Sequence, residues 1–321
     1  MTPSINDGRI AWFYARYTVV ATQEISAAGS LNIGTRGGAC RYCGKSQPDV
    51  TFKKQAHAFP EATGNKWLFS LDECDTCNDT FGRVIEDDFG KFSSPWRVMG
   101  RIRGKNGVPS YKASDRNLRI DVENTGDVRM SAHVDDPRFT IDDVNRRFTI
   151  HFERQPYTPM GVFKCFVKMS LAIMPREYLS RCAHLTRWIL EETHSYASFP
   201  YRPLVCFFQF IPGPLPNDRI WYILLRRKEN VSNVPYMQFV LHIGNAIYQI
   251  VLPFPKEDKA FLTGDSINIG YFPNPWLGEH EGIYGPVACS QLDLSSPEIK
   301  RNEDAPITMR FDHALPAEQK S

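Results

Sequence analysis

The spacing of apolar residues predicts a chain that mixes strands and helices. Residues 50–59 partly alternate between apolar and polar side chains, although Lys53 and Lys54 break the pattern, and this favours a short half-buried strand. The run at residues 67–71 favours a second strand, and the Pro, Gly and Asn of residues 60–65 favour a loop between the two. From residue 78 to 92 no proline occurs, and apolar side chains recur at the i, i+3, i+4, i+8 and i+11 spacing of one helix face: Phe81, Val84, Ile85, Phe89 and Phe92. The predicted order in this part is strand, loop, strand, helix.

The remaining two thirds of the chain show strand, helix and again strand patterns. Residues 98–152 alternate as strands do, with a turn at 124–127 inside a predicted hairpin. Residues 157–193 have helical spacing that Pro175 interrupts. Alternation then returns in four runs, at residues 204–211, 219–225, 236–243 and 247–252. We expect an α+β fold in which one or two helices pack on an antiparallel sheet, with a loosely held tail after about residue 286.

Composition places the chain among ordinary globular proteins. Of its 321 residues, 42% are hydrophobic and 23% are charged, and this length allows about two domains. No stretch approaches the roughly 18 consecutive apolar residues of a membrane span, and the apolar run at 10–21 contains Arg16 and lacks a signal-peptide cleavage site. We therefore expect a cytoplasmic protein with no membrane partner, in which cysteines are more often metal ligands than disulfides.

Four of the eight cysteines form two Cys-x-x-Cys pairs, Cys40 with Cys43 and Cys74 with Cys77. Each pair can hold one side of a tetrahedral ion, and two pairs complete a closed structural zinc site. The alternative is four reduced cysteines in a core. The other four cysteines stand alone, mostly among apolar neighbours, and are expected to be buried structural thiols.

The residues around these pairs resemble the HNH endonuclease family. The first pair is followed by AHAFPE at residues 56–61, by GN at 64–65 and by ECDTCN at 73–78. The resemblance covers about residues 38–92 and rests on the combination of paired knuckles, a His-x-x-Pro and an Asn after the last cysteine. It implies a ββα-metal core held by zinc, and an enzyme that hydrolyses DNA with a divalent cation, Mg²⁺ or Mn²⁺.

The resemblance assigns His57 as the general base and Asn78 as a ligand of the catalytic metal. A histidine of near-neutral pKa can take the proton of an attacking water, and a hard cation can neutralise charge on the phosphate. The family usually carries Asp or Glu, as a metal ligand, where this chain has Ala56. The central Asn of the family, which orients the base, also has no clear counterpart, since Phe69 or Ser70 falls nearest to it.

Either another carboxylate completes the metal site, or the nuclease is weakened. The candidates are Glu61, Glu73, Asp79 and Glu86. Glu86 follows Asn78 by eight residues, about 80° round an ideal helix, so the two can converge on one metal and Glu86 is included as a candidate ligand. The competing interpretation places Glu86 in a solvated acidic run and Glu61 at the start of a turn.

The net charge of +2 conceals two segments of opposite sign. Residues 72–88 carry seven acidic side chains and one basic one, whereas residues 93–119 carry seven basic and one acidic. A basic track beside a phosphodiesterase site suits contact with the DNA backbone, and the alternative is a solvated surface offset by the neighbouring acids. The candidate DNA-binding residues are Lys53, Lys54, Arg97, Arg101, Arg103 and Lys105.

We predict four parts: an N-terminal segment (1–35), a zinc-stabilised ββα nuclease domain (36–92), a basic, β-rich connector (93–152) and a C-terminal α+β domain (153–321). The last part shows no catalytic pattern and is a candidate for sensing a regulatory ligand, binding a partner protein or forming a homo-oligomer. The leading hypothesis is a DNA endonuclease, with defence against phage as one setting. The alternatives are a catalytically weak zinc-knuckle module that binds nucleic acid or protein, and an RNA-cleaving enzyme.

Overall fold

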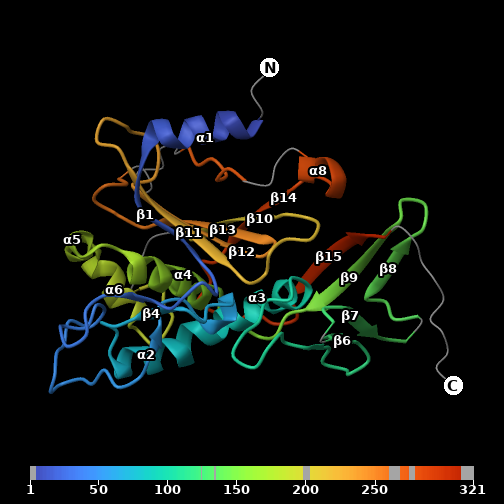
Figure 1. Cartoon of the computed structure of the whole chain (residues 1–321), viewed down its shortest axis with the longest axis horizontal. Helices are drawn as coiled ribbons and strands as arrows, with labels where there is room; N and C mark the ends of the chain where they lie inside the picture. Colours follow the sequence, from blue (N-terminus) through green and yellow to red (C-terminus); the bar gives the residue numbers. More distant parts are fainter. Residues whose placement is uncertain are drawn as a thin grey trace.

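A six-stranded antiparallel sheet forms the centre of the protein (Figure 1). The computed structural model describes residues 5–311, except 124, 134, 198–202, 260–267 and 275–278. The strands lie in the order β1 (Tyr17–Ile25), β11 (Ile220–Arg227), β12 (Met237–Ile243), β13 (Ala246–Leu252), β10 (Val205–Phe210) and β14 (Ala288–Asp293). The four strands predicted beyond residue 200 are therefore confirmed, and they are joined by an N-terminal strand and a later one.

Helices lie on both faces of this sheet (Figure 1). On one face α1 (Ile5–Arg16) packs through Phe13, and on the other α4 (Pro159–Ile173) and α6 (Ala183–Ile189) bury their apolar side chains. Every residue of α4 is buried. The predicted break at Pro175 is confirmed, since Pro175 precedes α5 (Arg176–Leu179) and the 3-10 turn Ser180–Cys182.

The part that resembles a nuclease forms a small sheet with the strand order β2 (Leu31–Ile33), β4 (Leu68–Ser70) and β3 (Ala56–His57). The strand predicted at 67–71 is confirmed, but the one at 50–59 shortens to two residues. The carboxylate of Asp75 accepts hydrogen bonds from the amides of Lys53 and Lys54 at 3.0 and 2.8 Å. These bonds hold the preceding residues as a loop, because the amides are no longer available to a strand ladder.

The helix predicted after residue 78 is present in three consecutive pieces: α2 (Asp75–Phe81), a π-helical turn (Gly82–Glu86) and α3 (Asp87–Met99). Its apolar face is confirmed, because Phe81, Ile85, Phe89 and Phe92 are all buried. The wide turn has a consequence for the site, since it changes the angle between Asn78 and Glu86 from that of an ideal helix.

The connector forms two three-stranded sheets, and the end of the chain takes part in one of them. The strands are β5 (Tyr111–Lys112), β6 (Arg119–Val122), β7 (Val128–Ser131), β8 (Phe139–Asp142), β9 (Arg147–Glu153) and β15 (Asp304–Arg310). The prediction of a loosely held tail is wrong for residues 286–311. β14 pairs with β10, and β15 pairs with β9 and buries Ala305 and Ile307 against the connector.

Strand pairing crosses the predicted boundaries between the parts. β1 from the N-terminal segment pairs with β11, and β2 pairs with β4. Phe59 and Phe89 share one core with α4 and β12, so the small sheet and the large one pack as a unit. Residues 1–4 and 312–321, at the ends of the predicted division, lie outside the described residues. Among the described helices, none is both long and apolar enough to cross a membrane.

A further short helix, α8 (Glu279–Tyr284), lies near the C-terminal end of the described chain, on the same side of the large sheet as α1 (Figure 1).

Candidate functional site

The four paired cysteines come together where the small sheet meets α2. The Sγ atoms of Cys40, Cys43, Cys74 and Cys77 all lie within 4.8 Å of one another. The Cys40–Cys77 and Cys43–Cys74 sulfur pairs are each 3.8 Å apart. A tetrahedral ion with bonds of about 2.3 Å places its sulfur ligands about 3.8 Å apart. The donor set and its geometry therefore fit a closed structural zinc site.

The local backbone shapes these cysteines into two knuckles. Gly44 adopts a φ of 72°, and its amide donates to the carbonyl oxygen of Cys40 at 2.9 Å. Cys74 caps α2, because its sulfur accepts a hydrogen bond from the amide of Cys77 at 3.5 Å. Burial raises the pKa of the Cys74 thiol to about 11, so metal binding at this site has to displace a proton.

His57 lies on β3 and is half-buried beside α4 and the turn that follows α2. Burial is the largest effect on its pKa and lowers it. Among the charges around the ring, those of Glu61 and Glu86 raise the pKa, while Lys168 and Lys105 lower it. The net effect is a lowered pKa, so the imidazole is neutral near pH 7 and can accept a proton.

Two of the four candidate carboxylates, Glu61 and Glu86, have charges that act on His57. Glu61 begins the 3-10 turn Glu61–Thr63, and Glu86 ends the π-helical turn. Both are partly open to solvent. These two carboxylates therefore approach the histidine from different parts of the chain, one from the loop after β3 and one from the helix.

The other two candidates lie in different surroundings. Glu73 is completely buried, and its carboxylate lies 3.5 Å from the Nζ atom of Lys168. A cation that retains part of its water shell cannot be accommodated there. Asp79 is on the surface and forms an ion pair with Lys54 at 2.5 Å. Glu73 and Asp79 are therefore poorer candidates for a catalytic-metal ligand than Glu61 and Glu86.

Lys168, in the middle of α4, connects the candidate site to the rest of the protein. Its fully buried ammonium group donates to the carbonyl oxygens of His57 and Ala58 at 2.7 and 3.3 Å. It also pairs with Glu86 at 3.1 Å and with Glu73 at 3.5 Å. Burial alone lowers the pKa of Lys168, but the two carboxylates raise it more, so the group stays charged. Sequence reasoning missed this residue, because it lies more than a hundred positions away from His57.

Asn65 holds the loop between β3 and β4 in place. Its buried side-chain amide donates to the carbonyl oxygens of Phe59 and Leu68, both at 2.9 Å. Its side-chain oxygen accepts from the amides of Trp67 and Leu68 at 3.2 and 2.9 Å. Phe69 and Ser70, which fall nearest to the place of the family's central Asn, carry no side-chain amide. Asn65 braces the loop after His57, and the Gly-Asn dipeptide of the motif was the signal for it.

The first knuckle also contacts α4. The guanidinium of Arg41 donates to the carbonyl oxygens of Leu171 and Met174 at 3.0 and 2.7 Å, at the C-terminal end of the helix. The hydroxyl of Tyr42 donates to the carbonyl oxygen of Lys168 at 3.3 Å. Arg41 and Tyr42, which lie between Cys40 and Cys43, thus fix the first knuckle to α4, the helix that carries Lys168.

The candidate DNA-binding residues separate into exposed and tethered ones. Lys53, Lys54, Arg103 and Lys105 are exposed, and Lys105 is close enough to His57 for its charge to lower the pKa of the ring. Two others are held by backbone carbonyls: Arg97 donates to Gly90 at 3.3 Å, and Arg101 to Gly126 at 3.2 Å. Arg97 is only partly exposed, and this burial lowers the pKa of its guanidinium.

Asn78 lies in α2, one residue after Cys77, and is partly exposed. Its backbone amide donates to the carbonyl oxygen of Cys74 at 3.0 Å. Among the described residues, no hydrogen bond joins its side chain to His57 or Glu86. Its assignment as a metal ligand remains a prediction.

Comparison with known families agrees with this geometry. Residues 40–93 match the family model described as HNH endonuclease. The match includes both cysteine pairs, His57 and the helix as far as α3, and it covers about a sixth of the chain. This segment is therefore an HNH endonuclease domain with a cysteine cluster suited to zinc. No curated protein and no solved structure was found to match the chain.

Proposed function

We propose that this protein is a metal-dependent endonuclease that hydrolyses phosphodiester bonds of DNA, with His57 as the general base. The observation that carries the proposal is the setting of His57 within the matched domain. The histidine is half-buried and has a lowered pKa, and the negative charges of Glu61 and Glu86 act on its ring. A neutral imidazole in this position can take the proton of a water molecule that attacks the phosphorus atom.

We propose Glu61, Glu86 and Asn78 as the residues that hold the catalytic cation, Mg²⁺ or Mn²⁺. Their donor atoms are the carboxylate and amide oxygens that these hard cations prefer. Glu61 takes the place of the carboxylate that the chain lacks at Ala56, because it is unpaired among the described ion pairs and acts on His57. The bound cation supplies neutralisation of charge on the phosphate and on the leaving oxygen.

The exposed lysines and arginine around the site support DNA as the substrate. Lys105 and Arg103 lie in the loop after α3, and Lys53 and Lys54 lie in the loop before β3. Phosphate contacts of this kind position a duplex without reading its sequence. We keep defence against phage as a working hypothesis for the cellular setting, with regulation by a ligand, a partner or self-association through the C-terminal part.

Cleavage of plasmid DNA with Mg²⁺ or Mn²⁺ tests the proposal. The wild type is expected to nick or linearise the plasmid, and His57→Ala is expected to lose this activity. The matched control is His151→Ala, because His151 is a partly exposed histidine on β9 that pairs with Asp304 at 2.8 Å. Equal cleavage by the wild type and His57→Ala would refute the assignment of the base.

The same assay separates the second candidate function, a nucleic-acid-binding module without catalysis. Two observations favour it: a methyl group stands at Ala56, and Glu86 is already paired with Lys168. This alternative would be established if the wild-type protein binds DNA with a steep salt dependence but does not cleave it in the presence of any metal ion tested. Parallel reactions with single-stranded RNA distinguish a DNA-cleaving from an RNA-cleaving enzyme.

A further inference from the structure

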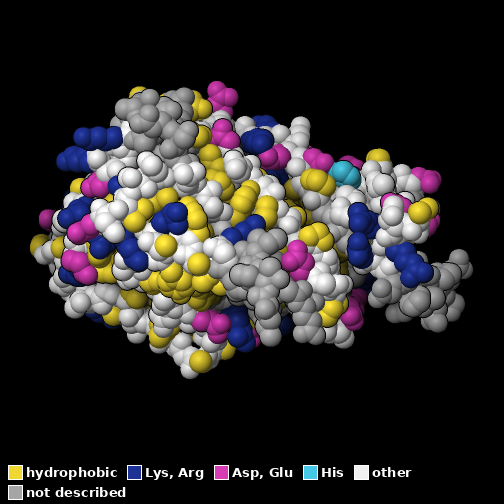
Figure 2. All heavy atoms as spheres, turned by 90° about the horizontal axis from the view of Figure 1, so that it is seen from above, with side chains coloured by type: hydrophobic (Ala, Val, Ile, Leu, Met, Phe, Trp, Pro, Cys, Tyr) yellow, Lys and Arg dark blue, Asp and Glu magenta, His cyan; other side chains and the backbone are white. Residues whose placement is uncertain are grey.

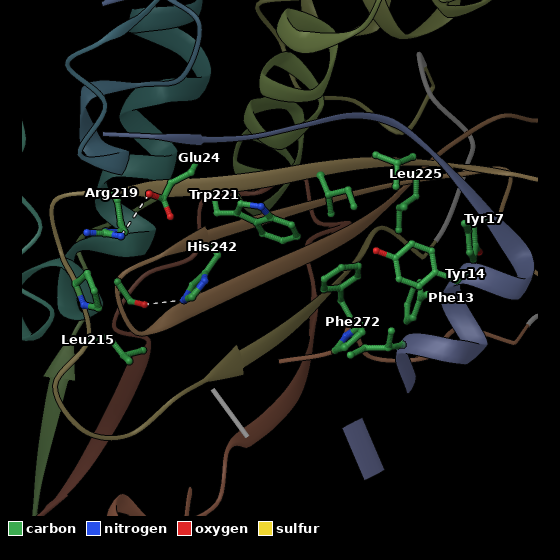
Figure 3. Close-up of a pocket in the computed structure, with 16 residues that line it drawn as sticks. Phe13, Tyr14, Tyr17, Glu24, Leu215, Arg219, Trp221, Leu225, His242 and Phe272 are labelled. Atoms are coloured by element: carbon green, nitrogen blue, oxygen red, sulfur yellow. Dashed lines mark hydrogen bonds and ion pairs between the residues drawn. The ribbon is translucent and has the colours of Figure 1, made fainter. Parts of the chain in front are cut away.

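A cavity of about 480 Å³ lies on the face of the large sheet that is turned away from the nuclease domain (Figure 3). Its floor is formed by Trp221, Ile223 and Leu225 of β11, and one wall by Phe13 and Tyr17 at the junction of α1 and β1. Phe272 lies beside this wall, with its ring centroid 5.1 Å from that of Phe13 and 5.6 Å from that of Trp221. This volume falls within the range of about 300–1,000 Å³ that is usual for small-molecule sites.

The cavity opens at a rim of apolar side chains that water contacts. Tyr14 is 65% exposed and Val19 is 37% exposed, and both line the cavity. In the view from the side of α1, hydrophobic side chains gather in a broad patch on this face (Figure 2). Exposed apolar surface around a concave site of this size is typical of a place where a ligand binds.

Glu24, Arg219 and His242 lie together at one end of the cavity, and this end carries little net charge. Glu24 and Arg219 form an ion pair at 3.3 Å, so their charges offset each other (Figure 3). Nearby, Nε2 of His242 donates to the carbonyl oxygen of Gly244 at 2.8 Å. Burial lowers the pKa of His242 to about 4, so the ring is neutral and its Nδ1 atom is a hydrogen-bond acceptor. A ligand with one N–H or O–H group suits this end better than an anion.

We propose that this cavity is a binding site for a neutral, mainly apolar small molecule that carries an aromatic ring and one hydrogen-bond donor. The aromatic ring packs against the continuous surface that Phe13, Phe272 and Trp221 form, and the donor reaches Nδ1 of His242. Aromatic walls favour such a ring through edge-to-face and offset contacts. The site is separate from the nuclease site and does not depend on the proposed cleavage reaction.

The position of the cavity also gives it a physical connection to the nuclease domain. Successive residues of β11 point to opposite faces of the sheet, so Tyr222 lies between the cavity-lining Trp221 and Ile223 but faces the other core. There its ring centroid is 5.4 Å from that of Phe59, two residues after His57. A ligand that shifts β11 therefore acts on the strand against which the loop of the general base packs.

Fluorescence titration with N-phenyl-1-naphthylamine tests the binding site. This probe is neutral, has aromatic rings and a single N–H group, and becomes fluorescent in apolar surroundings. The wild-type full chain is expected to bind it saturably with a stoichiometry of one. Its sulfonated analogue, 8-anilinonaphthalene-1-sulfonate, is expected to bind about tenfold more weakly. It adds a negative charge, and Arg219 does not compensate this charge because it is already paired with Glu24.

Two variants make the result specific to the cavity. Val19→Trp places a large side chain at the cavity rim, at a position exposed enough to tolerate it, and is expected to weaken probe binding about tenfold or more. The control is Ile141→Trp, at an exposed strand position of β8 in another sheet, which should leave binding unchanged. The thermal melting temperature of each variant verifies that it is folded.

Three results would overturn the proposal. The first is no saturable binding to the wild type, as expected if another part of the chain or a second copy fills the cavity. The second is equal binding by folded Val19→Trp and Ile141→Trp. The third is binding of the sulfonated analogue as tight as that of the neutral probe, which contradicts the proposed ligand class.

Discussion

The ammonium group of Lys168 donates a hydrogen bond to the carbonyl oxygen of His57 at 2.7 Å, across 111 positions of sequence. The lysine is completely buried on α4, and it also pairs with Glu86. This contact ties β3, the strand that carries the proposed general base, to a helix of the C-terminal half. The HNH endonuclease domain of residues 40–93 is therefore built into the larger fold by a residue outside that segment.

Replacement of Lys168 tests whether it positions and tunes the base. Lys168→Met leaves buried carboxylates unpaired and is expected to lower the free energy of unfolding by about 3–5 kcal/mol. It also removes a positive charge that lowers the pKa of His57, so the acidic limb of the cleavage profile should move to higher pH. Lys168→Arg keeps the positive charge, so its stability and its pH profile of cleavage should lie between those of the wild type and Lys168→Met.

Lys164→Met is the matched control for this experiment. Lys164 lies on the same helix and is also buried, but it donates to the carbonyl oxygen of Glu191 rather than to β3. Its loss should reduce stability without moving the pH profile. A purely structural role for Lys168 would give the same unshifted profile in both methionine variants.

The wild-type pH profile follows from the lowered pKa of His57. A general base acts in its neutral form, so activity is present above its pKa and is lost as the pH falls through it. Because burial lowers this pKa, half of the maximal rate should be reached at a pH below the ordinary histidine value of about 6.5. Initial rates of plasmid cleavage between about pH 4.5 and about pH 8 measure this loss of activity at low pH. A midpoint above about 6.5 would contradict the prediction.

The carboxylates near His57 and those elsewhere should differ in their effect on cleavage. Glu61→Gln is expected to reduce kcat by about 100-fold and to raise the Mn²⁺ concentration that activity requires. Asp79→Asn is the control, because Asp79 pairs with Lys54 on the surface. The two variants are compared by measuring the cleavage rate as a function of Mn²⁺ concentration. If Asp79→Asn loses activity and Glu61→Gln does not, the ligand assignment is wrong.

Loss of the zinc site should destabilise more than the small domain. Chelation or Cys74→Ser is expected to lower the melting temperature and remove one equivalent of zinc, and the loss should reach the large core because Arg41 and Tyr42 contact α4. Cys289→Ser is the control, since this cysteine is exposed on β14. Metal analysis and thermal denaturation measure both effects. Unchanged melting after complete removal of zinc would rule out a structural role.

Lys105 should contribute to DNA affinity through a phosphate contact. Lys105→Ala is expected to weaken binding on all sequences and to reduce the slope of log Kd against log salt concentration by about one. Arg129→Ala serves as the control, because Arg129 is exposed on β7, away from the site. Titrations at several salt concentrations give both slopes. Equal slopes for the two variants would exclude Lys105 from the DNA interface.

Much of the fold could be predicted from periodicity. The strands beyond residue 200, the connector hairpin and the apolar face of the helix from Phe81 to Phe92 were confirmed, because each element buries a regular set of apolar side chains. β15 was missed, since Ala305 and Ile307 alone give too weak an alternation. β3 was predicted too long, because the carboxylate of Asp75 takes the amides that a strand would use.

The sequence by itself determined the cysteine cluster and the class of the domain, since these depend on short spacings that local backbone geometry converts directly into a cluster. It also singled out His57 as the candidate base. Only the tertiary structure decided which distant groups surround His57. Lys168 and Lys105 reach His57 through packing of α4 and the loop after α3, and Tyr222 meets Phe59 across a sheet. Such contacts depend on how whole elements pack, because a buried charge or ring is placed by its partners and not by its neighbours in sequence.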